Sequence, residues 1–175
     1  MAIYVLPLLL LAVAAVLGLV LGRGTATDGN GNGNGRPDTR PLALPPVEAP
    51  DAGTAPCTQL LAALPPTLPA SPAPLPRLAL RPPAPTGAAA WAGPAGGDPV
   101  VLRCGLPRPA ELTPTSALIV INGVGWLDLS QPDRDTFIAV DRPVYLAVTV
   151  PRGLGTGPVQ TVSDTVRATL PANVR

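Results

Sequence analysis

The sequence contains no histidine and no lysine, and each absence removes a class of chemistry. Without histidine the chain cannot form a Ser-His-Asp triad or an imidazole-ligated metal centre, and without lysine it cannot form a Ser-Lys pair or a Schiff base. Twelve arginines stand against eleven acidic residues, which leaves a formal net charge of +1. This balance provides no basic surface for nucleic acid, and the residues indicate no metal and no cofactor. Carboxylate catalysis stays possible in principle.

Cysteine is scarce as well, because Cys57 and Cys104 are the only two. Two cysteines without histidine exclude a closed zinc site, which needs four ligands, and they lie too far apart for a Cys-x-x-Cys redox motif. Three interpretations stay open: a structural disulfide, two buried thiols, or one reactive thiol. A disulfide would close a loop of about 47 residues and contribute roughly 4 kcal/mol in the chain-entropy model. We expect the disulfide, which requires an oxidising compartment.

Charge is absent from residues 2–21, which are almost entirely apolar. Twenty helical residues span roughly 30 Å, the thickness of the hydrocarbon core of a membrane. We therefore expect residues 1–22 to be a transmembrane anchor in the lipid bilayer, with a cleaved signal peptide as the alternative.

The orientation of this expected anchor is ambiguous. Arginine occurs only after the apolar run, beginning at Arg23, and the positive-inside tendency then predicts a cytoplasmic body. The expected disulfide predicts the opposite side. We expect a single-pass protein of the cell membrane whose folded domain is extracytoplasmic.

Proline and glycine are abundant, with 26 and 18 residues, and they cluster. Residues 23–56 are rich in Gly, Asn and Pro, and the alternating Gly-Asn of residues 29–35 can neither bury apolar surface nor hold a defined backbone. We expect a disordered linker over residues 23–56 and one folded domain over residues 57–175.

The apolar pattern of residues 57–175 predicts an α+β domain. Apolar residues recur at helical spacing after Cys57 and again over residues 159–170. Runs of β-branched and aromatic residues bounded by Pro, Gly or Asp predict strands; they are residues 100–104, 116–123, 136–140 and 144–150, with a short edge strand at 77–81. We expect an antiparallel sheet of four to five strands with two helices on one face.

Three aspartates gather in the segment "WLDLSQPDRDTF", namely Asp128, Asp133 and Asp135. Carboxylates this close in sequence could act as an acid–base pair or bind a hard cation. The spacing of a calcium-binding EF-hand is missing, however. Clusters of Asp and Pro between strands are usually turns in which the side chains cap their own backbone, and we favour that interpretation.

Aromatic residues are rare, with two Trp, two Tyr and one Phe in the chain. Trp91, Trp126 and Tyr145 could together line a platform for a ligand or a partner. In a domain with so few aromatic residues, tryptophan more often fills the core or its rim. The core is therefore expected to be mainly aliphatic.

Several segments together resemble the actinobacterial family called domain of unknown function 3515. They are "CTQLLAALPPTL", "AAAWAGP…VVLRCGLPRPAELTPTSALIVINGVGWL" and "RPVYLAVTVP", and the resemblance covers about residues 47–171. The family consists of short envelope-directed proteins with a hydrophobic N-terminal segment, so the resemblance implies an envelope protein here. It implies no activity. The chain departs from the family in its extended "AGPAGGDP" segment and in lacking basic residues before the apolar run.

These observations predict an uncharacterised, membrane-anchored extracytoplasmic protein that acts as a non-catalytic binding or structural module of the cell envelope. The expected partner is an envelope protein or cell-wall material. Two alternatives are a carboxylate-based enzyme acting on cell-wall material and a carrier of a small ligand. An enzyme needs two carboxylates converging in a cleft, whereas a carrier needs an enclosed apolar pocket.

Overall fold

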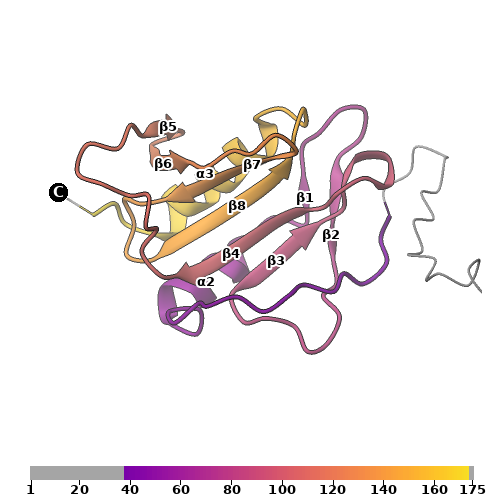
Figure 1. The fold of residues 1–175 in the computed structure, drawn as a ribbon. Helices are drawn as coiled ribbons and strands as arrows, with labels where there is room; N and C mark the ends of the chain where they lie inside the picture. Colours follow the sequence, from indigo (N-terminus) through magenta and orange to yellow (C-terminus); the bar gives the residue numbers. More distant parts are fainter. Residues whose placement is uncertain (1–37, 174–175) are drawn as a thin grey trace, which may run out of the picture. The chain divides into compact units, whose positions relative to one another are not determined.

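The computed structural model of the protein describes residues 38–173 (Figure 1). The expected anchor or signal segment, residues 1–22, and the first part of the expected linker lie outside the described residues. Within the described part of the chain, no helix is both long enough and apolar enough to cross a membrane.

A single antiparallel sheet of eight strands forms the centre of the described part, so the expected number of four to five strands is wrong. All its neighbouring strands are antiparallel, as the sequence predicts, and their order is β1-β2-β3-β4-β8-β7-β6-β5. The strands are β1 (Thr67–Leu68), β2 (Leu75–Leu78), β3 (Ala88–Trp91), β4 (Val100–Leu106), β5 (Ile119–Ile121), β6 (Val124–Asp128), β7 (Arg134–Ala139) and β8 (Tyr145–Pro151).

The additional strands arise in two places. The proline-rich stretch before β4 forms β1 and β3 in addition to β2, which is the strand predicted at residues 77–81 and found at Leu75–Leu78. β1, and not the predicted strand, forms the edge of the sheet. Proline is tolerated near an edge because fewer amide donors are needed there. The strand predicted at residues 116–123 is found as the shorter β5, and β6 follows it as a strand that was not predicted. Asn122 (φ 49°) and Gly123 (φ 79°) both adopt the left-handed conformation that a tight two-residue hairpin turn requires.

Two helices, α2 (Ala55–Ala63) and α3 (Gly157–Thr169), pack on one face of the sheet, as predicted (Figure 1). The predicted apolar face of α3 is confirmed, because Val159, Val162 and Val166 are almost completely buried. They pack in the main core with alternate residues of the central strands, among them Leu102 and Val148. This core is largely aliphatic, and its burial is the main stabilising contribution to the fold.

The opposite face of the sheet is covered only in part. Leu112, in the connection between β4 and β5, packs over Leu127, Ile138 and Ala147. A 3-10 turn, η1 (Pro94–Gly96), lies in the connection between β3 and β4. Elsewhere on this face Leu78 and Ala90 belong to another apolar cluster, which packs with Leu42 and Leu80. Polar side chains such as Thr149 also lie on this face.

Part of the segment expected to be a linker, residues 42–52, is packed on the folded domain. Leu42 pairs with Leu80 in an isolated parallel bridge, and the side chain of Arg103 donates to the carbonyl of Pro45 at 2.8 Å. Ala52 is buried. These contacts attach residues 42–52 to the sheet, and the Gly-Asn repeat at 29–35 lies outside the described residues.

Candidate functional site

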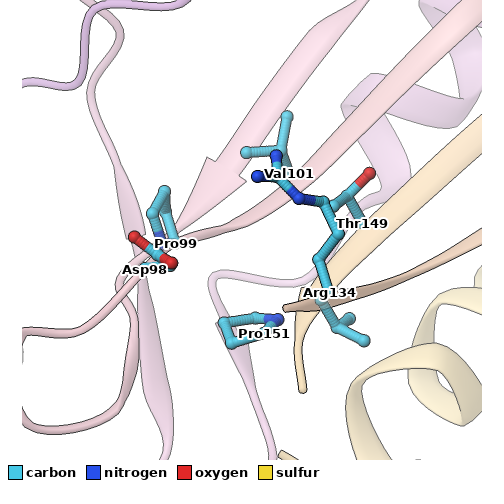
Figure 2. Close-up of a pocket in the computed structure, with 7 residues that line it drawn as sticks. Asp98, Pro99, Val101, Arg134, Thr149 and Pro151 are labelled. Carbon is cyan, nitrogen blue, oxygen red and sulfur yellow. The ribbon is translucent and has the colours of Figure 1, made fainter. Parts of the chain in front are cut away.

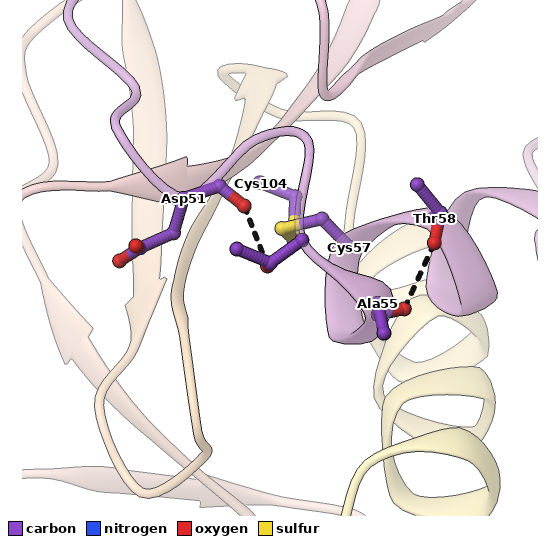
Figure 3. The surroundings of a disulfide bond; sticks show 6 residues. Asp51, Ala55, Cys57, Thr58 and Cys104 are labelled. Carbon is purple, nitrogen blue, oxygen red and sulfur yellow. Dashed lines mark hydrogen bonds between the residues drawn. A yellow bond between two sulfur atoms is a disulfide. The ribbon is translucent and has the colours of Figure 1, made fainter.

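The two cysteines form a disulfide, which confirms the prediction and excludes both thiol interpretations (Figure 3). Their Cα atoms are 5.6 Å apart, and both residues are fully buried. Cys57 lies in the first turn of α2 and Cys104 lies in β4, so the bond joins the helix layer to a central strand. The disulfide is therefore a structural cross-link of the core.

The residue after Cys104 explains how the chain can enter α2 so close to the sheet. Gly105 has a φ of +85° at a bulge in β4, and its carbonyl accepts a hydrogen bond from the N–H of Asp51 at 3.1 Å. A Cβ atom at this position would lie 2.2 Å from the backbone nitrogen of Ala52. Only glycine allows this approach, so the Cys-Gly pair is a packing feature of the turn before α2.

The aromatic platform suggested by the sequence is not assembled. Trp91 and Trp126 are fully buried on the helix side of the sheet, whereas Tyr145 packs with the cluster on the opposite face. Each indole N–H has a partner, the carbonyl of Pro65 for Trp91 and the hydroxyl of Ser163 for Trp126, both at 3.1 Å. Both tryptophans thus belong to the core, where a buried indole N–H requires an acceptor.

Of the three clustered aspartates, Asp128 and Asp135 line one open cavity and Asp133 does not. The cavity has a volume of about 490 Å³, within the range of ligand-binding clefts. We call it the corner groove. It is lined by Ile119, Val120, Ile121, Asn122, Asp128, Ser130, Asp135, Phe137, Arg152, Thr156 and Gln160.

The corner groove exists because β5 is shorter than its partner β6. Ile119, the first residue of β5, pairs with Trp126, and β6 then continues to Asp128. Leu118, which precedes β5, instead packs with the cluster on the opposite face. Side chains two residues apart in a strand point to the same face, so Asp128 faces the helix side, as Trp126 does. Near Asp128 the sheet therefore has no further strand at its edge.

The other wall of the corner groove comes from the connection between β8 and α3. Arg152 follows β8, Thr156 precedes α3, and Gln160 lies one turn into that helix. Farther along α3, Ser163 already contacts buried Trp126. Val159, next to Gln160, is buried in the main core, so only the side of the first helical turn that carries Thr156 and Gln160 borders the groove.

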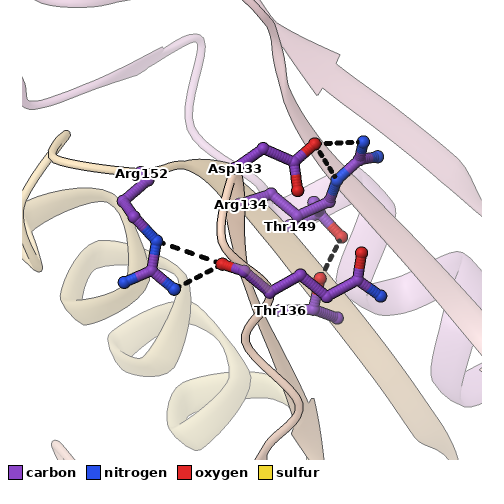
Figure 4. A network of polar contacts seen from close by, with 6 residues as sticks. Asp133, Arg134, Thr136, Thr149 and Arg152 are labelled. Atoms are coloured by element: carbon purple, nitrogen blue, oxygen red, sulfur yellow. Dashed lines mark hydrogen bonds and ion pairs between the residues drawn. The ribbon is translucent and has the colours of Figure 1, made fainter.

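The two aspartates of the corner groove differ in their charged partners. Asp135 forms an ion pair with Arg152 at 3.0 Å. The guanidinium of Arg152, labelled in Figure 4, also donates through Nε and Nη2 to the carbonyl of Gln131. Asp128 accepts hydrogen bonds from the N–H and hydroxyl of Ser130, a local turn of the kind favoured from the sequence. Asp128 forms no ion pair with any residue in 38–173. The groove thus carries one unpaired negative charge.

Asp133 lies outside the groove and pairs with its neighbour Arg134 at 2.6 Å (Figure 4). The hydrogen bond from Arg134 lowers the pKa of Asp133, and the same carboxylate raises the pKa of Arg134. Arg134 also lines a smaller cavity of about 190 Å³, where Asp98, Val101 and Thr149 are neighbours (Figure 2). Both charged groups are exposed, so this pair contributes little to stability.

A buried ion pair that the sequence analysis did not predict lies near the opposite end of α3. Arg142 is 4% exposed, pairs with Asp141 at 2.9 Å and donates to the carbonyl of Gly123. Asp141 also accepts from the N–H of Gly125, and Asn173 donates to the carbonyl of Arg142. This network ties the β7–β8 connection to the β5–β6 hairpin and to the C-terminal segment, which is a structural role.

The sequence analysis also missed Ile119, Val120 and Arg152 as groove residues. The signal for the first two was an uncharged apolar strand next to an Asn-Gly turn, since such a hairpin can end a sheet. Arg152 is distant in sequence from the aspartates, and only the strand order brings it to Asp135. Among the described residues no group of His, Cys, Asp or Glu is arranged to hold a metal ion.

The fold and site define a disulfide-linked α+β domain with one uncovered corner in its sheet. The sequence matches the family described as "Protein of unknown function (DUF3515)" over residues 9–174, and the chain therefore belongs to that family. No curated protein and no solved structure matches the chain at a significant level.

Proposed function

We propose that this protein is a non-catalytic binding module that acts outside the cytoplasm, in the envelope of an actinobacterial cell, and that the corner groove is its binding surface. The observation that carries the proposal is the groove itself. It combines exposed apolar side chains of an edge strand with an unpaired carboxylate at an uncovered corner. An exposed apolar patch with a few polar groups around it is typical of an interaction site.

Two features support the extracytoplasmic location. The buried disulfide requires an oxidising compartment during folding. The sequence also begins with an uncharged apolar run at residues 2–21, which is typical of proteins directed to or across a membrane.

Binding is favoured over carboxylate catalysis by the surroundings of the two groove aspartates. A general acid at neutral pH needs a carboxyl group kept protonated by apolar surroundings or by a second carboxylate. Asp135 instead faces the guanidinium of Arg152, and Asp128 accepts two hydrogen bonds from Ser130. Asp135 is thus held by a cationic partner and Asp128 by a local turn, and both arrangements suit recognition of a partner.

Site-specific photocrosslinking in intact cells tests this proposal. A photoreactive phenylalanine analogue is placed at Val120, which is 71% exposed in the groove wall, and in a matched variant at Val47, an exposed valine outside the groove. We expect discrete crosslinked products from position 120 that are absent from position 47. Equal crosslinking from both positions, or none from position 120, would contradict the proposal.

A further inference from the structure

Resting on the proposed function of the corner groove, we propose that its ligand is an extended peptide segment of a partner protein. The segment adds to β5 as a ninth strand and places an arginine or lysine against Asp128. Three features support this ligand: an edge strand without proline or charge, the outward direction of the Val120 main-chain groups, and the charge of the groove.

The two edges of the sheet are protected very differently. At one edge, β1 has only two residues, and it is preceded by Pro65 and Pro66 and followed by Pro69. Short length and proline are common devices that prevent another strand from pairing with an edge. The other edge, β5, is also short, with three residues, but its sequence Ile-Val-Ile contains neither proline nor charge. Proline and charge, two of the usual devices, are therefore missing from this edge strand.

The side chains of β5 are exposed, as expected for an edge strand that is open to pairing. Val120 is 71% and Ile119 43% exposed, and both line the corner groove. Apolar side chains at a free edge are costly in solvent and are a predicted site of strand pairing. A peptide strand placed there would cover them.

The hydrogen-bonding groups of Val120 point away from the sheet. Val120 pairs with Gly125, whose carbonyl accepts from Val140 and whose N–H donates to Asp141, both on the far side of β6. In an antiparallel ladder, paired residues that do not bond to each other direct their main-chain groups outward on both strands. The N–H and C=O of Val120 are therefore available to a further strand, and this is the arrangement used in β-strand addition.

The charge of the groove indicates that the bound peptide carries a basic side chain. Asp128 and Asp135 contribute two negative charges, and Arg152 offsets one of them through its ion pair with Asp135. Asp128 lies beyond the end of β5, where a peptide running along the edge continues past Ile119. A basic side chain there completes an ion pair with Asp128.

The probe for this proposal is a fluorescent, capped seven-residue peptide of alternating threonine and valine with one central arginine. Three control peptides replace the arginine by glutamine, replace it by glutamate, or carry N-methyl groups on alternate residues to block main-chain hydrogen bonds. Binding to the full-length chain, held in an amphipathic polymer without free detergent, is measured by fluorescence anisotropy. We expect the arginine peptide to bind most tightly and the N-methylated peptide to lose at least about tenfold in affinity.

Variants of the edge strand distinguish strand addition from nonspecific hydrophobic binding of the peptide. Val120→Pro removes the outward N–H of residue 120. The hydrogen bonds between β5 and β6 are made by Ile119 and Ile121 and should persist, so the melting temperature of Val120→Pro should stay close to that of Val120→Thr. Val120→Thr keeps the amide and is the matched control. We expect about tenfold weaker binding for Val120→Pro and less than a twofold change for Val120→Thr. Equal binding by both folded variants would overturn strand addition.

A charge exchange at Asp128 tests the basic residue of the peptide. Asp128→Asn should weaken the arginine peptide by up to about fivefold, the range of an exposed ion pair, and leave the glutamine peptide unchanged. Asp128→Lys should reverse the preference, so that the glutamate peptide binds more tightly than the arginine peptide. An unchanged order of affinities in Asp128→Lys would overturn the assignment of the basic residue.

The outcomes also separate this inference from the proposed function. Groove-specific crosslinks at position 120 in cells, together with no effect of N-methylation or Val120→Pro on peptide binding, would retain the groove as a binding surface and overturn strand addition. Absence of both would overturn both. Sedimentation that shows a Val120→Pro-sensitive dimer without peptide binding would overturn the peptide partner, because the occupant would then be a second copy of the chain.

Discussion

Reduction of the Cys57–Cys104 disulfide should strongly destabilise the folded domain. The bond joins residues 47 apart in sequence, and the chain-entropy model assigns a loop of this length about 4 kcal/mol. For a domain of this size, one kcal/mol corresponds to about 3 °C in melting temperature, so we expect a decrease of roughly 12 °C. Both cysteines are fully buried, so the reduced thiols should still fill the same space in the core.

The assay compares thermal and urea unfolding of the full-length protein with and without a strong reductant. Circular dichroism gives the midpoints, and alkylation before and after reduction counts the free thiols. The dependence of the unfolding free energy on urea should become steeper after reduction, because an unfolded chain without the cross-link exposes more surface. A double variant, Cys57→Ala with Cys104→Ala, is the control, since reductant should leave its midpoint unchanged.

Two results would refute this reasoning. A decrease in the melting temperature of less than about 3 °C on complete reduction would show that the cross-link does not restrict the unfolded chain as the loop length predicts. An equal effect of reductant on the double alanine variant would show that the reductant acts elsewhere.

Three further predictions concern the packing and the charges around the site. Gly105→Ala should destabilise by several kcal/mol or prevent folding, because a Cβ there meets backbone at 2.2 Å and φ is positive; urea unfolding measures this. Ser163→Ala should cost about 1–3 kcal/mol by leaving the indole N–H of Trp126 without its acceptor, and adding Trp126→Phe should recover part of that loss in a double-mutant cycle. Arg134→Gln should raise the pKa of Asp133 toward its ordinary value, which NMR of the carboxyl carbon can follow. In the wild type, the lowered pKa stabilises the folded state at pH values above the ordinary pKa of an aspartate, and this stabilisation is lost as the pH falls through the lowered pKa. The variant should lack this contribution.

Much of the local structure could be predicted from the sequence. The spacing of Val159, Val162 and Val166 predicted the buried face of α3, and β-branched runs predicted β4, β7 and β8. These elements are long enough for their periodicity to be read, because their buried residues repeat over several turns or pleats. The cysteine count and the apolar N-terminal run likewise pointed to the disulfide.

The number of strands could not be predicted in the same way. β1 and β3 together have six residues, so their pairing depends on neighbours that the local pattern does not reveal. β6 was also missed, because the predicted strand at residues 116–123 included Asn122–Gly123, which is the turn of a hairpin that continues into β6.

The sequence by itself determined which chemistries are absent, where the principal helices and central strands form, and that two cysteines were available to cross-link them. Only the tertiary structure decided that both tryptophans are internal and that Arg152 meets Asp135. It also decided that, within residues 38–173, β5 is an edge strand beside an Asp128 that has no ion pair. The physical reason is that side-chain periodicity is a local property of the chain. Strand order and the lengths of paired strands instead depend on contacts between distant segments, and the corner groove is a product of both.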